Sequence, residues 1–273
     1  MKRLLEGITL ISLSIVSVLT LVRSQVKVSS SGAAEAGRTP VVVELFTSEG
    51  CSSCPPADAL LARLDGAQLN ENVQLIALEE HVDYWNDLGW TDPFSSRDWT
   101  SRQNAYAGVL GNRNPYTPQM VVDGTVEFLG SHPQKARQAI MEAAGKPKVP
   151  VILEQRPASK TGTEDFSVKV GKLEGTAKHD AAEVWLAITE TGLHSAVTRG
   201  ENAGEELRHA SVVRTMRKIG EAKGDGETSF AEDASVSLQK EWKRENLKAV
   251  VLVQEKKSRR ILGAAEIHIG QQI

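Results

Sequence analysis

Two cysteines, Cys51 and Cys54, are the residues whose type and spacing most directly indicate chemistry in this sequence. The run from Val41 to Phe46 before them is apolar and β-branched except for one acid, which predicts a short buried strand. Pro55 and Pro56 after them suit a first helical turn. The spacing of one helix face then follows, at Ala57, Leu60, Leu61 and Leu64. The Cys-x-x-Cys pair therefore lies where a strand ends and a helix begins.

A helix start favours a thiolate, because its backbone N–H groups are unpaired and the helix dipole is positive there. We therefore expect Cys51, as the more N-terminal and more exposed sulfur, to have a lowered pKa and to act as the nucleophile. Cys54 would be the resolving thiol one turn later. A plain structural disulfide is the alternative, although closing so short a loop gains only about 2 kcal/mol in the loop-entropy model.

The composition of the whole chain excludes several functions. A net charge of -3 and a pI of about 6.1 predict no basic surface for nucleic acid. Two cysteines are too few for a disulfide-rich scaffold, and the second cysteine pair of a typical structural zinc site is missing. We therefore expect no metal site, and thiol-disulfide chemistry at a cysteine pair needs no organic cofactor.

The N-terminus has the pattern of an export signal. Lys2 and Arg3 precede an apolar run from Ile8 to Val22, so residues 1–23 are interpreted as a signal peptide, or alternatively as an uncleaved membrane anchor. Residues 24–39 are rich in Ser, Ala and Gly and are interpreted as a linker. We expect an exported protein, periplasmic or secreted, whose cysteine pair rests as a disulfide in an oxidising compartment. Membrane contact is expected only through an uncleaved anchor.

A second apolar run, Val73 to Leu78, has the length of a parallel strand covered on both faces. His81 and Asp83 follow it, at the end of a strand where ligands of open α/β sheets gather, so both could assist catalysis. A purely structural histidine is the alternative.

Residues 83–116 are an insertion rich in aromatic residues. Ser95 and Asp98 form a capping pair for a helix that runs to Leu110 and stops at Gly111. The aromatic side chains, which include Tyr84 and Trp85, could bind an extended polypeptide substrate. The alternative is that they form the insertion's own small core.

A hairpin and a helix complete the first part of the chain. Gln119 to Val122 and Val126 to Leu129 flank an Asp123-Gly124 turn, which is a strong hairpin signal. Ser131 then caps a helix that ends at Gly145, with an apolar face at Ala136, Ala139, Ile140 and Ala143.

This order of elements resembles the thioredoxin fold, in which a Cys-x-x-Cys follows the first strand. Thr117-Pro118 matches the family's second signature, which implies a cis-proline opposite the cysteine pair and a substrate contact at Thr117. The segments FTSEGCSSCPPAD, HVDYW, GWTDPF, YTPQMVVDG and GENAGEELRHASVVR are similar to the bacterial secreted proteins of domain-of-unknown-function family 1223. The resemblance implies a thioredoxin-like domain over residues 40–147. It implies no particular reaction, because the family has none assigned.

The resemblance also suggests a role for Glu44, which lies near the position of the buried acid of thioredoxins. A buried carboxylate has a raised pKa and could accept the proton of Cys54. A salt-bridged Glu44 is the alternative. The dipeptide between the cysteines is Ser-Ser rather than Gly-Pro, so the redox potential of thioredoxin does not carry over.

Residues 148–273 have a different pattern, with separated strand-like runs and glycine-bearing links. We expect a smaller antiparallel β domain, sandwich-like and packed beside the first. The expected strands are Val149 to Leu153, Phe166 to Val170, Glu183 to Thr189, Val250 to Gln254 and Ile261 to Ile269. The segment Leu207 to Ile219 is basic, and a solvated face is favoured over an anion-binding patch of Arg208, His209, Arg214, Arg217 and Lys218.

Taken together, these features predict an exported α/β protein that acts as a thiol-disulfide oxidoreductase through Cys51 and Cys54. Its expected partners are disulfides of proteins or small thiols and a redox partner protein. Two alternatives belong to other classes: a Cu(I)-binding protein, since two thiolates suit a soft metal, and a redox-inert interaction module.

Overall fold

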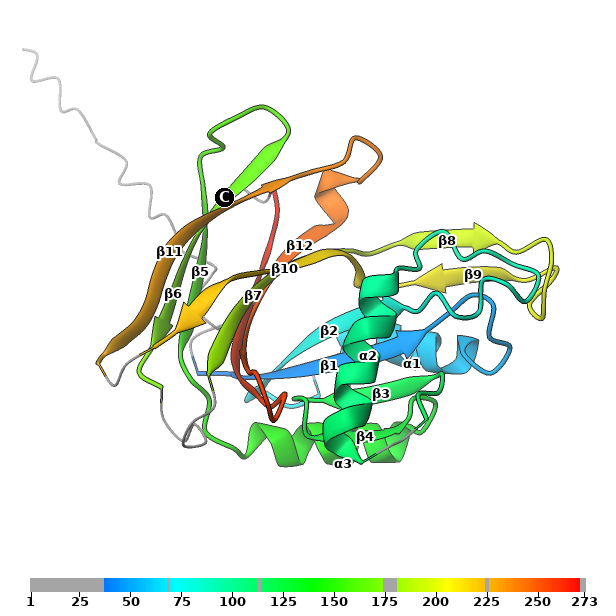
Figure 1. Ribbon diagram of the computed structural model, residues 1–273, viewed down its shortest axis with the longest axis horizontal. Helices are drawn as coiled ribbons and strands as arrows, with labels where there is room; N and C mark the ends of the chain where they lie inside the picture. Colours follow the sequence, from blue (N-terminus) through cyan, green and yellow to red (C-terminus); the bar gives the residue numbers. More distant parts are fainter. Residues whose placement is uncertain (1–36, 68, 112–113, 174–180, 224–225, 271–273) are drawn as a thin grey trace, which may run out of the picture.

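A computed structural model gives the protein a mixed α/β fold that is mostly sheet (Figure 1). The structure describes residues 37–67, 69–111, 114–173, 181–223 and 226–270. Within them lie three α-helices, an eight-stranded mixed sheet and two small antiparallel sheets. The helices are α1 (Pro55–Asp65), α2 (Arg97–Leu110) and α3 (Pro133–Ala144).

The large sheet has the strand order β13-β12-β7-β10-β2-β1-β3-β4. Its strands are β1 (Thr39–Thr47), β2 (Val73–His81), β3 (Gln119–Val122), β4 (Val126–Leu129), β7 (Ala182–Glu190), β10 (Val212–Ala222), β12 (Leu247–Glu255) and β13 (Ile261–His268). β1 and β2 pair in parallel, whereas β3 pairs antiparallel to β1. The two central strands are buried along nearly their whole length, because layers cover both faces.

The alternation of β1 divides its side chains between two cores. Val41, Val43 and Leu45 pack with α1 and α3, whereas Val42 and Phe46 pack on the opposite face with α2. The helices α1 and α3 thus cover one face of this part of the sheet and α2 covers the other (Figure 1). The predicted apolar faces of α1 and α3 are confirmed by the burial of their residues.

The hairpin of β3 and β4 has the predicted bounds and the predicted turn. Asp123 and Gly124 both have positive φ, 48° and 67°, as a two-residue hairpin turn of this hand requires. A Cβ on Gly124 would lie 2.0 Å from the carbonyl oxygen of Arg259. Glycine is therefore needed here both for the backbone angle and for the close approach of the loop between β12 and β13.

The helix starts differ from the prediction by one residue. Ser96, not Ser95, caps α2 and accepts a hydrogen bond from the backbone N–H of Asp98, while Gly111 ends the helix with φ of 78°. His132, not Ser131, is the N-cap of α3, and Gly145 follows its end. Ser95 is instead bonded to Asn86 in the preceding loop.

The strands after residue 148 correct the predicted arrangement of the second part. Four of them, β7, β10, β12 and β13, extend the large sheet beyond β2 rather than forming a sheet of their own. The connection is short: Val212 of β10 pairs with Glu79 of β2 in parallel. One continuous sheet therefore crosses the boundary predicted between residues 147 and 148.

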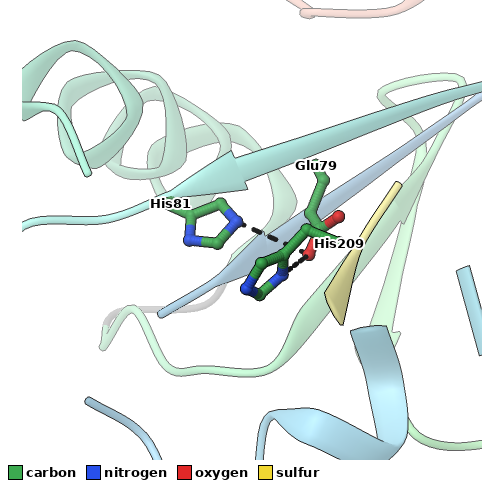
Figure 2. Close-up of side chains that lie close together, drawn as sticks. All are labelled: Glu79, His81 and His209. Atoms are coloured by element: carbon green, nitrogen blue, oxygen red, sulfur yellow. Dashed lines mark hydrogen bonds and ion pairs between the residues drawn. The ribbon is translucent and has the colours of Figure 1, made fainter. Parts of the chain in front are cut away.

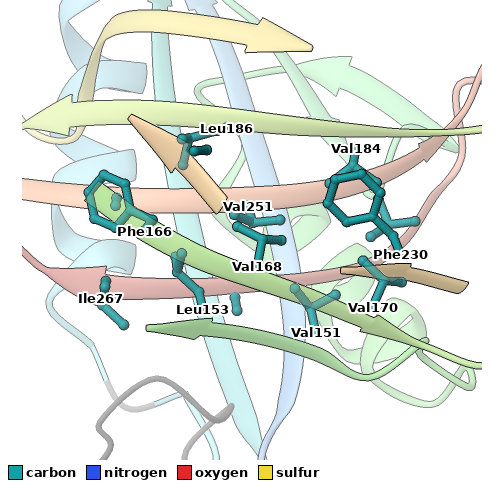
Figure 3. Close-up of a cluster of buried hydrophobic side chains, with 14 of the residues drawn as sticks. Val151, Leu153, Phe166, Val168, Val170, Val184, Leu186, Phe230, Val251 and Ile267 are labelled. Carbon is teal, nitrogen blue, oxygen red and sulfur yellow. The ribbon is translucent and has the colours of Figure 1, made fainter. Parts of the chain in front are cut away.

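The sandwich-like packing is present at the far end of that sheet. β5 (Val151–Arg156), β6 (Thr163–Gly171) and β11 (Thr228–Ser237) form a three-stranded sheet whose apolar face packs on β7, β12 and β13 (Figure 3). Phe166, Val168 and Leu153 meet Leu186 and Val251 in this core. The strand β11 has no counterpart in the prediction.

Two short strands and one turn complete the described structure. β8 (Leu193–Ala196) and β9 (Glu206–His209) form a two-stranded sheet near the start of α1, and η1 (Arg244–Asn246) is a 3-10 turn before β12. The predicted signal or anchor in residues 1–23 and most of the predicted linker in residues 24–39 lie outside the described residues. Within the described part of the chain, no helix has the length and apolar character needed to cross a bilayer.

Candidate functional site

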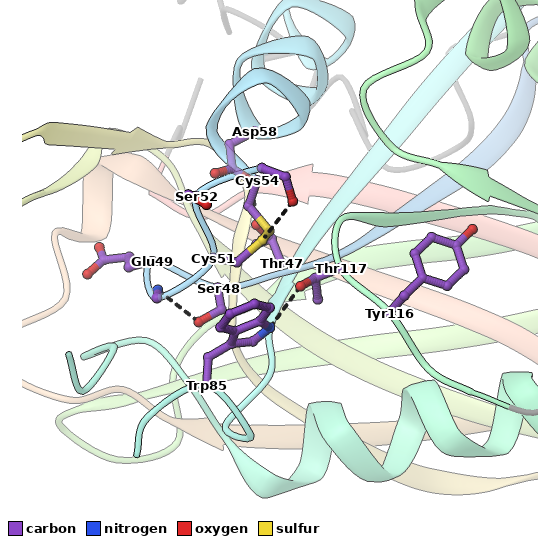
Figure 4. Close-up of a disulfide and its surroundings, with 12 residues drawn as sticks. Thr47, Ser48, Glu49, Cys51, Ser52, Cys54, Asp58, Trp85, Tyr116 and Thr117 are labelled. Carbon is purple, nitrogen blue, oxygen red and sulfur yellow. Dashed lines mark hydrogen bonds between the residues drawn. A yellow bond between two sulfur atoms is a disulfide. The ribbon is translucent and has the colours of Figure 1, made fainter. Parts of the chain in front are cut away.

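Cys51 and Cys54 form a disulfide between the end of β1 and the start of α1, as their placement in the sequence predicted (Figure 4). Cys54 is the N-cap residue of α1, and its carbonyl accepts from the N–H groups of Ala57 and Asp58. The expectation of an exposed Cys51 is wrong, because both cysteines are 0% exposed. Ser52 and Ser53 between them are exposed instead.

The segment between β8 and β9 contributes to this burial. Asn202 Nδ2 donates to the carbonyl oxygens of Glu49 and Cys51, at 2.8 and 3.1 Å. The carboxylate of Glu201 accepts from the backbone N–H and the hydroxyl of Ser52, at 3.1 and 2.7 Å. These contacts join residues about 150 positions apart, so a sequence pattern with a period of two or 3.6 residues cannot reveal them. The motif around Gly200 was visible in the sequence only through the family resemblance.

Thr117 and Trp85 lie on the other side of the cysteine loop. The Thr117-Pro118 bond is cis, as the resemblance implied, and Pro118 is buried. Trp85 Nε1 donates to Thr117 Oγ1 at 2.9 Å (Figure 4). A Cβ on Gly50 would lie only 3.0 Å from Trp85 Cβ, so this tryptophan packs directly beside the residue before Cys51.

Pro118 also lies close to the first turn of α1. A Cβ on Gly130 would be 3.2 Å from Ala57 Cβ and 3.4 Å from Pro118 Cβ, so these two residues flank the same glycine. Tyr84, the other aromatic residue proposed for substrate binding, is 41% exposed and donates to Gln103 at 3.2 Å. Trp99 and Tyr106 are buried in the core under α2, which matches the alternative that aromatic residues of the insertion form a core.

Glu44 lies away from the position expected for a proton acceptor of Cys54. Its side chain points to the α2 face of β1, where it pairs with Arg102 Nε at 2.6 Å and accepts from the hydroxyl of Tyr106 at 2.5 Å. Thr47, three residues later, points to the opposite face and contacts α1. The structure therefore matches the alternative, in which Glu44 forms a salt bridge.

Asp58 is a buried acid close to the cysteines in the sequence, and sequence reasoning missed it. It lies in the first turn of α1, four residues after Cys54, and accepts from Thr47 Oγ1 at 2.6 Å. Burial, with the negative charge of Glu79 adding to it, raises the pKa of Asp58 to about 7. Its spacing from Leu61 would place it on the buried helix face, which is the signal that could have found it.

His81 and Asp83, proposed to assist catalysis, have different surroundings. His81 is fully buried, and its Nδ1 lies 2.7 Å from Asp92 Oδ2. Burial lowers the pKa of His81, but the charge of Asp92 outweighs it, so that the pKa is well above the usual value. The carboxylate of Asp83 accepts from Thr100 Oγ1 at 2.5 Å at the start of α2.

His209 is the second buried histidine, and it corrects the interpretation of its segment as a basic face. Its Nδ1 lies 2.8 Å from Glu79 Oε1 and its Nε2 lies 3.1 Å from Glu49 Oε1. Burial lowers the pKa of His209, but the charge of Glu79 and the bonds to both acids raise it to about 9. The pKa of Glu79 is lowered in turn: burial raises it, but the charge of His209 outweighs burial.

The other basic residues of that segment do not gather into an anion patch. Lys218 pairs with Glu183 and Glu221, and Arg214 lies between the rings of Phe94 and Trp242. Arg217 donates to the carbonyl oxygen of a residue in β11.

Comparison with known proteins places this geometry in a family. A family model described as "Protein of unknown function (DUF1223)" matches residues 42–254. The chain belongs to the DUF1223 family. The match includes the cysteine pair of this DUF1223 protein, the start of the hairpin and the segment that covers Cys51. No curated protein matches the chain.

Solved structures resemble this DUF1223 protein over most of its length. A structural-genomics protein from Agrobacterium tumefaciens is 26% identical, with a TM-score of 0.62, and the match covers 86% of this chain and 96% of that one. The protein HBP35 of Porphyromonas gingivalis is 16% identical, with a TM-score of 0.66, and the match covers 86% of this chain and 76% of that one. The second similarity is one of fold alone.

Proposed function

We propose that this DUF1223 protein is a thioredoxin-like thiol-disulfide oxidoreductase whose reactive groups are Cys51 and Cys54. One observation carries the proposal: the two cysteines are bridged at the start of α1, with a buried acid, Asp58, one helical turn away. A bridge spanning so few residues contributes little to stability, which favours a chemical role.

The surrounding elements support the thioredoxin-like part of the proposal. β1, α1 and β2 form a parallel βαβ unit, and the β3-β4 hairpin pairs with β1 from the other side and leads into α3. The start of the hairpin, at Thr117 and Pro118, lies near the first turn of α1. This is the arrangement expected for a Cys-x-x-Cys that meets its substrate beside a cis-proline.

The proposed reaction exchanges one disulfide for another. In the reduced protein, the thiolate of Cys51 attacks a substrate disulfide, forms a mixed disulfide and releases one substrate thiolate. The thiol of Cys54 then loses its proton and attacks the Cys51 sulfur, which releases the second substrate thiolate and closes the Cys51–Cys54 bridge. The substrate gains two electrons from the cysteine pair, and a redox partner protein exchanges them with the pair in turn.

Asp58 is the group that we propose for the proton of Cys54. Cys54 is the N-cap of α1 and Asp58 lies four residues later in its first turn, and i and i+4 positions lie on the same helix face. A pKa of about 7 lets the carboxyl group give or take a proton near neutral pH. In this role Asp58 replaces Glu44, whose carboxylate is engaged by Arg102.

Substrate contacts are proposed for the residues around the cysteine loop. Trp85 packs beside it, the neighbouring Tyr84 is exposed, and Thr117 precedes the cis-proline. An exported location is proposed on the charged and apolar pattern of residues 1–23, and it agrees with a pair that rests as a disulfide.

A redox-inert disulfide is the second candidate, because both cysteines are 0% exposed and the segment around Asn202 binds to the loop that holds them. The two candidates differ in a simple way. A reactive pair must open to substrates, whereas an inert one stays closed.

Trapping with cysteine variants tests the proposal. Cys54→Ser leaves the attack by Cys51 intact but removes the thiol that resolves it, so reducible higher-mass adducts should accumulate on non-reducing gels. Cys51→Ser should trap none, because opening of the segment around Asn202 would uncover the Cys51 side of the loop, whereas Cys54 stays fixed as the N-cap of α1. Both proteins should be expressed with the full chain in the compartment to which it is exported. Equal, empty lanes for both variants would favour the inert disulfide.

A further inference from the structure

Three buried side chains, Glu79, His81 and His209, converge on one point (Figure 2). One nitrogen or oxygen of each lies within 4.8 Å of the others. Glu79 Oε1 is 2.8 Å from His209 Nδ1 and 3.5 Å from His81 Nε2. The residues come from the ends of β2 and β9, so the fold rather than local sequence brings them together.

In each histidine, the ring nitrogen on the side away from Glu79 Oε1 contacts a second carboxylate. His81 Nδ1 contacts Asp92 and His209 Nε2 contacts Glu49. These carboxylates are fixed in turn, because Asp92 accepts from the backbone N–H of Glu49 and Glu49 accepts from Trp90 Nε1. A carboxylate behind each imidazole is the usual outer shell of a metal-binding histidine, since it fixes the tautomer and the ring orientation.

The carboxylate of Glu79 is also held in place by a neighbouring group. Its Oε2 accepts from the backbone N–H of Ala210 at 2.9 Å, which leaves Oε1 directed at the two histidines. His81 Nε2 is buried and has no hydrogen-bond partner among the described residues, although it points at Glu79 Oε1. An unpartnered buried nitrogen costs free energy unless something else occupies its lone pair or proton.

We propose that Glu79, His81 and His209 form a binding site for a divalent transition-metal ion of the zinc type. Two imidazole nitrogens and one carboxylate oxygen are the donor set that zinc prefers in three-ligand sites, and a fourth position remains for another ligand. The site is distinct from the cysteine pair, whose sulfurs are joined to each other. It goes beyond the proposed redox function and reverses the expectation of a protein without metal.

Without a metal, the same residues would form a network of ion pairs. The test must therefore distinguish a metal site from an ion-pair network. A metal site predicts one bound ion whose neighbours are two imidazoles and no sulfur. A simple ion-pair network predicts no bound ion. Because the three residues are 0 to 4% exposed, the ion should enter most readily while the chain folds.

The first measurement needs no variant. The full chain, with its disulfide closed, is unfolded, refolded with excess Zn²⁺ and freed of unbound metal. We expect one zinc per chain, and X-ray absorption at the zinc edge should show imidazole nitrogens at about 2.0–2.1 Å without sulfur. Absence of retained zinc, or a spectrum dominated by sulfur or lacking imidazole, would overturn the proposal.

Variants then assign the ligands. His81→Gln and His209→Gln should each lose the bound zinc, whereas His194→Gln, which changes an exposed histidine of β8, should retain it. Asp92→Asn keeps an acceptor for His81 Nδ1 and should weaken binding about 10- to 100-fold, as expected for an outer-shell change. Circular dichroism checks that each variant folds. Folded His81→Gln and His209→Gln proteins that both retain wild-type zinc would also overturn the assignment.

The redox proposal and the metal proposal can fail separately. The zinc measurements use the closed disulfide, so they do not depend on reactivity of Cys51. Cobalt provides an independent readout, because Co²⁺ bound by imidazole and carboxylate has visible absorption that should disappear in His209→Gln and persist in His194→Gln.

Discussion

At the scale of single residues, opposing contributions set the pKa of Asp58. Burial and the charge of Glu79 disfavour its charged form, while the charge of His209 and the hydrogen bond from the Thr47 hydroxyl stabilise that form. The result is a carboxyl group that changes its charge near neutral pH. Such a group can take the proton of Cys54 without a histidine at the helix start.

Replacement of Asp58 by Asn should therefore slow the resolving step. Asp58 is protonated below its pKa of about 7 and becomes a base above it, so in metal-free wild-type protein the rate should rise between about pH 6 and 8. Asp58→Asn should be about 10²-fold slower at pH 8 and should lose this pH dependence. The rate is measured by mass spectrometry as the decay of a mixed disulfide between Cys51 and a small thiol.

The matched control is Asp65→Asn, which makes the same change at the end of the same helix. Asp65 pairs with Lys248, far from the proposed proton transfer, so the rate and its pH profile should stay as in wild type. An Asp58→Asn protein with the wild-type profile would remove Asp58 from the mechanism.

Stability provides a second readout for Asp58. Its pKa is raised on folding, so the native state binds more protons than the unfolded state between about pH 4 and 7, and stability falls as pH rises through that range. Asp58→Asn cannot lose a proton. It should therefore show a smaller decrease in unfolding free energy over this range in urea titrations.

At the scale of elements, the segment between β8 and β9 binds the loop that holds the cysteines. Two of its residues bind that loop in different ways: Glu201 binds the exposed Ser52, whereas Asn202 is buried and binds carbonyl oxygens. Local opening of a loop held by few contacts requires much less free energy than global unfolding. The reactivity of the disulfide should therefore follow the stability of this loop.

Glu201→Ala should accordingly speed reduction of the Cys51–Cys54 bridge by dithiothreitol, by about two- to tenfold, since it removes the hydrogen bonds to Ser52. Glu205→Ala, at an exposed position of the same segment, is the control and should react like wild type. Rapid quenching with an alkylating reagent gives both rates. Equal rates in Glu201→Ala and wild type would mean that the segment does not limit access.

The sequence predicted most elements because their patterns are local. The apolar run of β1, the face of α1 and the Asp123-Gly124 turn each depend on residues within a few positions. β11 was missed because its sequence, TSFAEDASVS, includes two acids and several small residues, and only Phe230, Ala234 and Val236 reach the core. Glu44 was assigned to the wrong face of β1. The apolar run of this strand indicates burial on both faces, but it does not indicate which face lies on the side of the cysteines.

The close packing of the hairpin turn can be tested with two glycines. Gly124→Ala should destabilise the protein by more than about 1 kcal/mol, because the new Cβ meets the Arg259 carbonyl and the backbone has φ of 67°. Gly108→Ala, within α2 and with nothing within 4 Å of its Cβ position, should stabilise by about 0.5–1 kcal/mol. Denaturant titration measures both, and a neutral Gly124→Ala would contradict the packing.

At the scale of the whole molecule, the candidate metal site depends on contacts across the predicted domain boundary. His209 comes from the second part of the chain and Glu79 from the first, and each lies at the point where β10 joins β2. Sequence reasoning placed His81 correctly at a strand end but could not pair it with a residue 128 positions later. Contacts between distant strands leave no periodic signal in a single sequence.

The core under α2 is likewise built from both parts. Val42 and Ile76 from the first part share it with Val250, Leu252 and Ile261 from the second. A chain ending at residue 147 would expose this apolar surface and leave the edge of β2 unpaired after β10 is removed. The two predicted domains, 40–147 and 148–273, are therefore expected to fold together.

A fragment of residues 37–147 tests this expectation. We expect it to aggregate or to unfold without a cooperative transition, although it contains the cysteine pair and all three helices of the described structure. The full chain from residue 37 is the control and should unfold in one transition by circular dichroism and tryptophan fluorescence. Loss of the partner strands should also leave His81 without His209, so the fragment should retain no zinc after refolding. A fragment that unfolds cooperatively with native-like near-ultraviolet dichroism would instead establish residues 40–147 as an independent domain and the shared core as an interface between two folded units.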